Sequence, residues 1–148
     1  MARTMTGGCQ CGRVRYAVEV ENADAILCHC SMCRRATGGA FTPYVSVSTA
    51  GLRWQGEPDR YQSSPIAHRP FCSRCGTPLG FAVLDEGDKL DLTLGSFDDP
   101  GFFVPTCNYA VEGLLPAWQD TAHLPRMRSD ENPGVAQRWM DKVGKLPD

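Results

Sequence analysis

Long apolar runs are missing from this 148-residue sequence. No apolar stretch approaches the roughly 20 residues that a membrane-spanning helix needs, so we expect no membrane partner. Residues 1–8, which precede the first cysteine motif, also contain no apolar stretch, and this argues against a secretory signal peptide. The default expectation is therefore a cytoplasmic location.

A charge excess of either sign is also missing. Lys and Arg total 15 while Asp and Glu total 17, which leaves a net charge of −2. The nearest thing to a basic run is Arg34-Arg35. Because two adjacent charges do not make the extended basic surface that nucleic acids or anionic lipids require, we expect no nucleic-acid partner.

Segments with helical periodicity are nearly absent. The one convincing helix lies near the C-terminus, where Asn132 would cap it, Pro133 would take its first position and Gly144 would end it. No internal repeat, low-complexity tract or linker interrupts the chain. We therefore predict a single domain over residues 1–148.

Short strands account for most of the remaining pattern. Residues 13–20 alternate, with Val14, Tyr16 and Val18 on one face of a half-buried strand. Pro43 predicts that its own strand lies at a sheet edge or carries a bulge. Strands recurring about every ten to twelve residues favour a mainly β fold of layered antiparallel sheets with a short C-terminal helix. The other predicted strands cover residues 25–27, 41–47, 52–55, 60–63, 67–71, 79–83 and 90–94.

Cysteine is the residue type that points to function. The chain has eight, and in a reducing compartment closely spaced cysteines are more often metal ligands or redox centres than disulfides. Seven of them form three short-spaced clusters: Cys9 and Cys11; Cys28, Cys30 and Cys33; Cys72 and Cys75.

The spacing within each cluster suits zinc. Two residues between Cys72 and Cys75 allow both sulfurs to face one ion, and Gly76 permits the tight turn of a zinc knuckle. On an extended segment, cysteines two residues apart project from the same face, so both sulfurs can reach one ion about 2.3 Å away. A Cys-x-x-Cys pair alone would also fit a redox centre.

Seven ligands divide naturally into four plus three. A structural zinc site needs four ligands, whereas a catalytic site uses three and keeps one position open. The pairing of clusters stays open at this point, because either Cys-x-Cys could join Cys72 and Cys75. The third cysteine, Cys33, argues that its triplet stands apart as the open site.

The remaining cysteine and the histidines are weaker candidates. His29 lies between two ligands, but on an extended segment its ring would point away from them. His68 and His123 are isolated, and we expect surface or core positions for both. Cys107 has no neighbouring cysteine and is predicted to be a small buried apolar residue.

The open site favours chemistry at a sulfur atom. Three thiolates around Zn²⁺ leave a formal charge of −1, which makes a weaker activator of water than three neutral histidines would give. A small-molecule thiol could complete the site as a thiolate at neutral pH. Arg34 and Arg35 directly follow the triplet and could offset its charge or bind a substrate carboxylate, or form an ordinary solvated pair.

The three cysteine motifs occur within longer stretches that resemble one family. Together the stretches are similar to the glutathione-dependent formaldehyde-activating enzyme family, over about residues 7–126. They are Gly8-Cys9-Gln10-Cys11-Gly12, Cys28-His29-Cys30-Ser31-Met32-Cys33-Arg34-Arg35, Phe71-Cys72-Ser73-Arg74-Cys75-Gly76-Thr77-Pro78-Leu79 and Leu94-Gly95-Ser96-Phe97-Asp98-Asp99-Pro100.

This resemblance implies a fold, a cofactor and a reaction. The fold would be Mss4-like, and two zinc ions would be bound per chain. The activity would be that of a carbon–sulfur lyase on the adduct of glutathione and formaldehyde, S-hydroxymethylglutathione, so the partners would be a small thiol and an aldehyde. The implied ligand sets are Cys9, Cys11, Cys72 and Cys75 for a structural site, and Cys28, Cys30 and Cys33 for the catalytic one.

One position departs from the family pattern. Many relatives carry a histidine after the late Pro-Thr motif, where this chain has Cys107 and then Asn108. Asparagine cannot act as an acid or base, so a proton-transfer role there would be lost. Two other functions stay open. One is a non-catalytic zinc module for protein–protein interaction, in which a protein group, with His29 as one candidate, completes the second site. The other is redox sensing through the triplet after zinc loss.

Overall fold

The computed structural model describes residues 1–85 and 87–147. The chain divides into two compact units, residues 1–115 and residues 116–148, and each is described by itself. The single domain predicted for residues 1–148 stays a prediction. All of the predicted metal ligands lie in the first unit.

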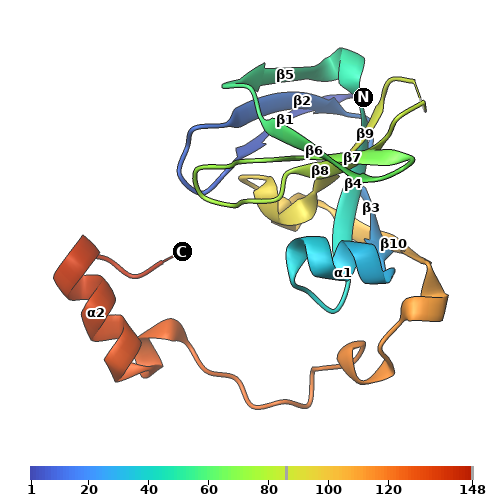
Figure 1. Ribbon diagram of the computed structural model, residues 1–148. Coiled ribbons are helices and arrows are strands. Elements are labelled where there is room, and N and C mark those ends of the chain that lie inside the picture. The colour runs from blue at the N-terminus through green and yellow to red at the C-terminus, as the bar shows by residue number, and fades with distance from the viewer. Residues whose placement is uncertain (86, 148) are drawn as a thin grey trace. The chain divides into compact units, whose positions relative to one another are not determined.

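The first unit is built from two β-sheets (Figure 1). The smaller sheet has the strand order β1-β2-β5, and the larger has the order β10-β3-β4-β9-β8-β7-β6. The predicted mainly β architecture is therefore confirmed. The strands are β1 (Arg3–Gly8), β2 (Arg15–Val20), β3 (Asp24–Cys28), β4 (Thr42–Ser48), β5 (Leu52–Gln55), β6 (Asp59–Ser64), β7 (Ala67–Phe71), β8 (Gly80–Val83), β9 (Lys89–Thr93) and β10 (Val104–Tyr109).

Three elements of this unit escape the sequence pattern: β1, β10 and the helix α1 (Ser31–Thr37). The seven residues of α1 are too few to show a helical period, and they overlap the cysteine triplet. All six residues of β10 are exposed, so no buried face marks this strand. In β1 the buried positions are Met5 and Gly7, and a glycine gives no apolar signal.

The prediction that Pro43 places its strand at a sheet edge is wrong. β4 lies inside the larger sheet, between β3 and β9. Pro43 pairs with Leu27 of β3, but pairing with β9 begins one residue later, at Tyr44 opposite Thr93. The proline therefore stands where β4 has only one paired neighbour, and its missing N–H interrupts no pairing on the other side.

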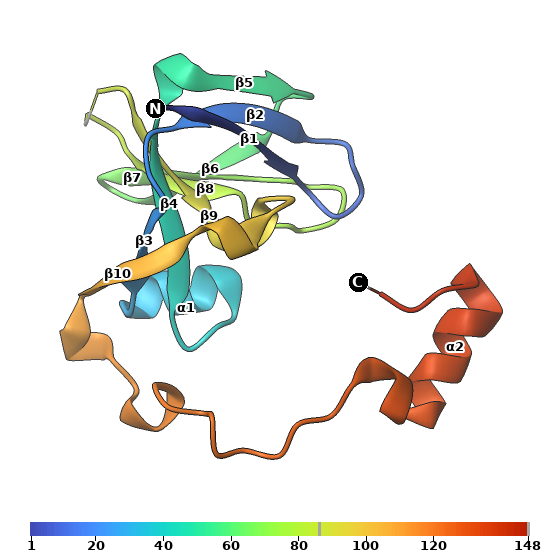
Figure 2. The same ribbon diagram turned by 180° about the vertical axis from the view of Figure 1, so that it is seen from behind.

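One strand pair also departs from the predicted antiparallel pattern. β10 runs parallel to β3, from Val104 opposite Asp24 to Tyr109 opposite Cys28. Parallel neighbours need a long connection, and here all the strands from β4 to β9 intervene. Figure 2 shows β10 lying along β3 at the edge of the sheet, close to α1. This arrangement brings a late segment of the chain to the cysteine triplet.

The main hydrophobic core lies between the two sheets. Val18 on β2 and Leu92 on β9 are completely buried, and Val45 on β4 packs in the same cluster. Tyr16 stands edge-on to both Trp54 and Phe97, with ring centroids 5.5 Å apart in each pair. The core therefore sets the position of one sheet over the other, which decides how the cysteine-bearing turns meet.

We expect Gly7→Ala to destabilise this packing. Gly7 forms an isolated bridge with Phe97, and an added Cβ would lie 2.3 Å from the Ser96 carbonyl oxygen. Overpacking of this kind costs about 1–3 kcal/mol, so the midpoint of urea unfolding should fall. Gly95→Ala is the matched control, because its added Cβ would have no neighbour within 4 Å. Equal midpoints for both variants would contradict the prediction.

The second unit contains the helix α2 (Pro133–Val143). As predicted, Asn132 is its N-cap, Pro133 its first residue and Gly144 its left-handed C-cap, with φ of 81°. Glycine reaches this φ without steric cost, which explains why the helix ends there. Within the described residues, the helices are each too short or too polar to cross a membrane.

Candidate metal centres

The first cluster joins two turns from different sheets. Cys9 and Cys11 lie in the turn after β1, and the predicted extended geometry is wrong here: the Gly12 amide donates to the Cys9 carbonyl at 3.1 Å. Cys72 and Cys75 lie in the turn after β7, where Gly76 has the positive φ of 80° that a tight turn requires. Four thiols thus meet where the two sheets adjoin.

The spacing of these four sulfurs fits a tetrahedral ion. The Sγ atoms of Cys9 and Cys11 are 3.6 Å apart, and those of Cys11 and Cys72 are 3.7 Å apart. Two ligands each 2.3 Å from one zinc ion at the tetrahedral angle would be about 3.8 Å apart. All four, Cys75 included, lie within 4.8 Å of one another. The donor set and its spacing therefore match a closed Zn²⁺ site.

Hydrogen-bond donors surround this cluster. The Val14 amide donates to the Cys9 sulfur at 3.3 Å, and two guanidinium groups donate to sulfurs: Arg13 to Cys72 at 3.4 Å and Arg74 to Cys11 at 3.1 Å. Such donors favour thiolates over thiols.

The pKa of Cys75 shows this effect. Hydrogen bonding by the Thr77 side chain lowers the pKa of the Cys75 thiol to about 5. Because zinc binds the thiolate form, a thiol that ionises this readily favours metal binding at neutral pH.

The second cluster holds three thiols at the junction of a strand and a helix. Cys28 ends β3, Cys30 is the N-cap of α1, and Cys33 lies within that helix. The Cys33 amide donates to the Cys30 sulfur at 3.3 Å, so the sulfur serves as the helix cap. The three sulfurs lie within 4.8 Å of one another. The structure therefore brings the predicted triplet together, and the triplet is separate from the cluster of Cys9, Cys11, Cys72 and Cys75.

β10 and the segment after it hold the triplet in place. The His29 amide donates to the Tyr109 carbonyl at 2.9 Å. The Arg34 guanidinium donates to the carbonyls of His29, at 2.8 Å, and of Gly113. Arg34 thus binds backbone oxygens, whereas the neighbouring Arg35 is exposed. Of the two arginines predicted to offset the charge of the triplet, Arg34 therefore binds the backbone of the neighbouring loop.

His29 is not one of the clustered ligands. Its ring points to Asn108, with 2.8 Å between Nε2 and Oδ1, and packs 5.5 Å from the Phe41 ring. Within the described residues, the metal-ligating group that contains Cys28 consists of three cysteines only. Asn108 therefore orients His29 through a hydrogen bond.

Cys107 is exposed on β10, which overturns the prediction of a buried apolar residue. The strand lies at the edge of its sheet, and none of its six residues is buried.

Sequence reasoning missed two further residues at the triplet. Arg69 of β7 and Tyr44 of β4 both hydrogen-bond the Cys33 sulfur, each at 3.5 Å, and Arg69 also donates to the Tyr44 hydroxyl at 2.9 Å. These residues are 36 and 11 positions from Cys33 in the chain, so no local motif could reveal them. An arginine inside a strand pattern, flanked by His68 and Pro70, was the one available signal.

The surroundings of Cys33 favour its thiolate. Hydrogen bonding from the Cys28 thiol is the largest cause, followed among the lowering effects by Tyr44 and Arg69, and together they lower the pKa of the Cys33 thiol to about 4. The same pairing raises the pKa of Cys28, which remains the proton donor. Of this pair, Cys33 is therefore the sulfur that favours the thiolate form.

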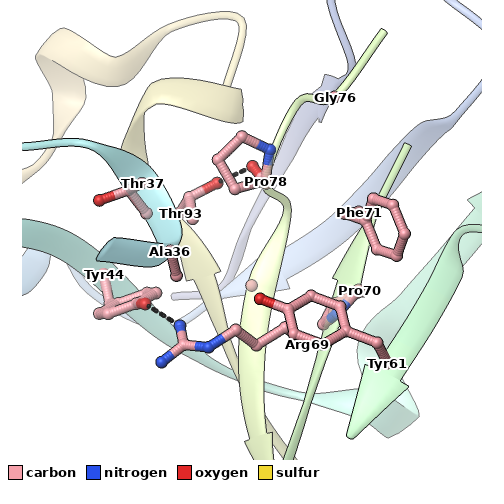
Figure 3. Close-up of a pocket in the computed structure, with 11 residues that line it drawn as sticks. Ala36, Thr37, Tyr44, Tyr61, Arg69, Pro70, Phe71, Gly76, Pro78 and Thr93 are labelled. Atoms are coloured by element: carbon pink, nitrogen blue, oxygen red, sulfur yellow. Dashed lines mark hydrogen bonds between the residues drawn. The ribbon is translucent and has the colours of Figure 1, made fainter. Parts of the chain in front are cut away.

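A cavity of about 200 Å³ adjoins this site. Tyr44 and Arg69 form the part of its wall next to the triplet, and Thr37, Tyr61 and Pro78 line other parts (Figure 3). Tyr44 and Arg69 both contact the Cys33 sulfur, whereas none of the three cysteines lines the cavity itself.

A comparison with known families now bears on these centres. A family model described as "glutathione-dependent formaldehyde-activating enzyme" matches residues 4–112, which include both cysteine clusters. The chain belongs to this family. The resemblance inferred from the motifs is therefore confirmed.

Two individual proteins are similar to this chain. An uncharacterized lyase of Schizosaccharomyces pombe is 30% identical over 76 residues, which are 51% of this chain and 56% of that protein. The match thus spans about half the length of this curated relative. The crystal structure of a Rhodobacter sphaeroides protein matches with a TM-score of 0.55 and 27% identity, covering 69% of this chain and all of that one.

Proposed function

We propose that this protein is a zinc-dependent carbon–sulfur lyase or synthase that makes or breaks a thiol–aldehyde adduct such as S-hydroxymethylglutathione. The observation that carries the proposal is the triplet: three clustered sulfurs with no fourth protein ligand among the described residues. Three protein ligands and one open position are the pattern of catalytic zinc sites. The family match and the lyase relative support the reaction class.

Within this proposal the two clusters have different roles. Cys9, Cys11, Cys72 and Cys75 would hold a structural zinc ion, and Cys28, Cys30 and Cys33 would hold the catalytic one. Zinc, when bound at the triplet, supplies a positive charge that favours the thiolate form of a thiol ligand. The predicted cytoplasmic location, where thiols stay reduced, belongs to the same proposal.

The protein's own residues would prepare the sulfur chemistry. Cys28 and Cys33 hold their sulfurs in a buried site, while Cys30 stays partly exposed. In the synthesis direction a bond forms between the substrate sulfur and the carbonyl carbon, the sulfur loses its proton and the carbonyl oxygen gains one. The lyase direction reverses both changes. No electrons are transferred, so the reaction needs no redox cofactor.

The cavity limits how the thiol would sit. Ligand pockets for drug-sized molecules are about 300–1,000 Å³, so about 200 Å³ is too small for a whole tripeptide. None of the three cysteines lines this cavity, so we propose that the substrate sulfur and its hydroxymethyl group bind outside it, at the triplet, from the side of the partly exposed Cys30. The rest of a glutathione molecule would lie over the surface of the protein.

His29 and Asn108 would act on the site's shape and take no part in proton transfer. The His29 ring is only 2% exposed, and its Nε2 is held by Asn108. The other ring nitrogen, Nδ1, is also buried, so neither nitrogen is presented to a substrate at the triplet. The alternative of a non-catalytic module loses support, because it needs a protein group as the fourth ligand of the second metal site, and the described residues offer none, His29 included.

Exchange NMR of formaldehyde with glutathione tests the proposal directly. We expect the zinc-loaded protein to speed exchange between free thiol and hydroxymethyl adduct, because it holds the thiolate next to the aldehyde. Protein stripped of metal is the control and should leave the exchange rate at its background value. The proposal fails if exchange is no faster with the loaded protein for a panel of small thiols and aldehydes.

A further inference from the structure

Arg69 is a buried charge that has no carboxylate partner among the described residues. Arg69 is 4% exposed, and its guanidinium carbon lies 4.9 Å from the centre of the Phe81 ring. Across residues 1–85 and 87–147, its polar partners are the Tyr44 hydroxyl and the Cys33 sulfur. A buried cation is costly unless an anion balances it. The sulfur of the triplet is the anion that the structure offers.

The number of guanidinium groups follows the charge of each cluster. Four thiolates and Zn²⁺ sum to −2, and two arginines, Arg13 and Arg74, donate to sulfurs of the four-cysteine cluster. Three thiolates and Zn²⁺ sum to −1, and one arginine, Arg69, donates to the triplet. The two sites differ in the exposure of their arginines. Arg13 is partly exposed and is also paired with the Asp59 carboxylate, whereas Arg69 is buried.

Tyr44 orients the Arg69 guanidinium toward the Cys33 sulfur. Its hydroxyl accepts a hydrogen bond from Arg69 at 2.9 Å and donates its own proton to the Cys33 sulfur at 3.5 Å. The tyrosine is 2% exposed, so water does not compete for these bonds. Two donors therefore converge on one sulfur, and each strengthens the other in a low-dielectric site.

We propose that Arg69, oriented by Tyr44, is a positioning residue that supplies the counter-charge required for an anionic thiolate to enter the triplet site. This inference rests on the proposed function. A thiolate as fourth ligand would bring the zinc cluster to −2, and the Arg69 charge reduces the local total to −1. Because the group is buried, this charge is screened far less than a surface charge would be.

The geometry separates this role from binding of a substrate carboxylate. Arg69 directs its Nη1 and Nη2 atoms at Tyr44 and Cys33, and its 4% exposure leaves little surface for a ligand. Arg35, two residues after Cys33, is exposed and has the freedom that a carboxylate site would need. Arg69 therefore acts through the cysteine sulfur, and Arg35 serves as the matched control.

The test measures thiol binding to full-length protein loaded with Co²⁺, whose bonds to sulfur give charge-transfer absorption. We expect Arg69→Gln to raise the dissociation constant of 2-mercaptoethanol about ten- to a hundredfold, the usual effect of losing a hydrogen bond to a charged group. Arg69→Lys should recover part of the loss, because it keeps the charge. Arg35→Gln should stay within about twofold of the unmodified protein, because an exposed charge contributes little.

A second thiol and a second variant complete the design. Loss of 2-mercaptoethanol and 3-mercaptopropionate binding to the same extent supports a charge acting on sulfur, while loss confined to the carboxylated thiol overturns the inference. If Arg69→Gln does not load cobalt, Tyr44→Phe takes its place, since it keeps Arg69 and removes one donor to Cys33. Unchanged thiol affinity in that variant overturns the inference.

The outcomes also separate this inference from the function on which it rests. Thiol binding that is equal in the unmodified protein and in Arg69→Gln overturns the role of Arg69 and leaves the proposed function standing. Absence of thiol binding in the cobalt-loaded unmodified protein overturns both.

Discussion

Cys72→Ala is expected to unfold the first unit of the protein. Cys72 is completely buried, and its sulfur belongs to the cluster that joins the turn after β1 to the turn after β7. Those turns belong to different sheets, so a metal ion bound by this cluster would join one sheet to the other. Structural zinc contributes about 10–16 kcal/mol in zinc-finger peptides. The net stability of a domain is only about 5–15 kcal/mol, so losing a ligand should remove most of it.

Circular dichroism and metal analysis check this result. We expect Cys72→Ala to lose the β-sheet signal or to unfold without a cooperative transition, and to lose the zinc ion of the four-cysteine cluster. Cys107→Ser is the matched control, because Cys107 is exposed and belongs to neither cluster. It should keep two zinc ions and the unfolding midpoint of the unmodified protein. A Cys72→Ala protein with a native spectrum and midpoint would show that this cluster does not hold the fold together.

Cys30→Ser is expected to abolish activity while the fold is retained. Serine is among the preferred N-cap residues, so its hydroxyl can replace the Cys30 sulfur in accepting the Cys33 amide. The triplet then has two thiolates in place of three. Mutating a residue that merely supports a metal ligand costs about 10–100-fold, so removing a ligand should lower adduct exchange by more than about a hundredfold.

The same protein samples provide the controls. Metal analysis of Cys30→Ser should find one zinc ion per chain, and its circular dichroism and urea midpoint should stay close to those of the unmodified protein. The pair of variants thus tests whether the clusters have different roles. Equal unfolding in Cys72→Ala and Cys30→Ser would remove the distinction between a structural and a catalytic centre. So would a Cys30→Ser protein that keeps two metal ions and full exchange.

Features encoded over a few residues could be predicted from the sequence. Cys72-x-x-Cys75 followed by Gly76 specifies a turn that holds two sulfurs together, and the structure has this turn. Pro133 and Gly144 likewise delimit α2, because each acts on the backbone at its own position. Alternation located most strands of both sheets for the same reason: the pleat repeats every two residues, whatever the strand packs against.

Features that depend on which segments meet could not be predicted. The exposure of Cys107 follows from the placement of β10 at a sheet edge, and its own residues do not determine that placement. Pro43 lies in an interior strand because the pairing register with β9 begins after it. The turn geometry of Cys9 and Cys11 likewise depends on the sheet from which they emerge. In each case a long-range pairing overrides the local expectation.

By itself, the sequence determined a mainly β fold and seven cysteines in short-spaced motifs that could hold metal ions, because strand alternation and ligand spacing are local properties of the chain. Only the tertiary structure decided what surrounds the sulfurs. Arg69 and Tyr44 reach Cys33 from β7 and β4, and their effect depends on burial and on distances of 3.5 Å. Charge balance acts through space, and only the folded arrangement of strands brings these groups together.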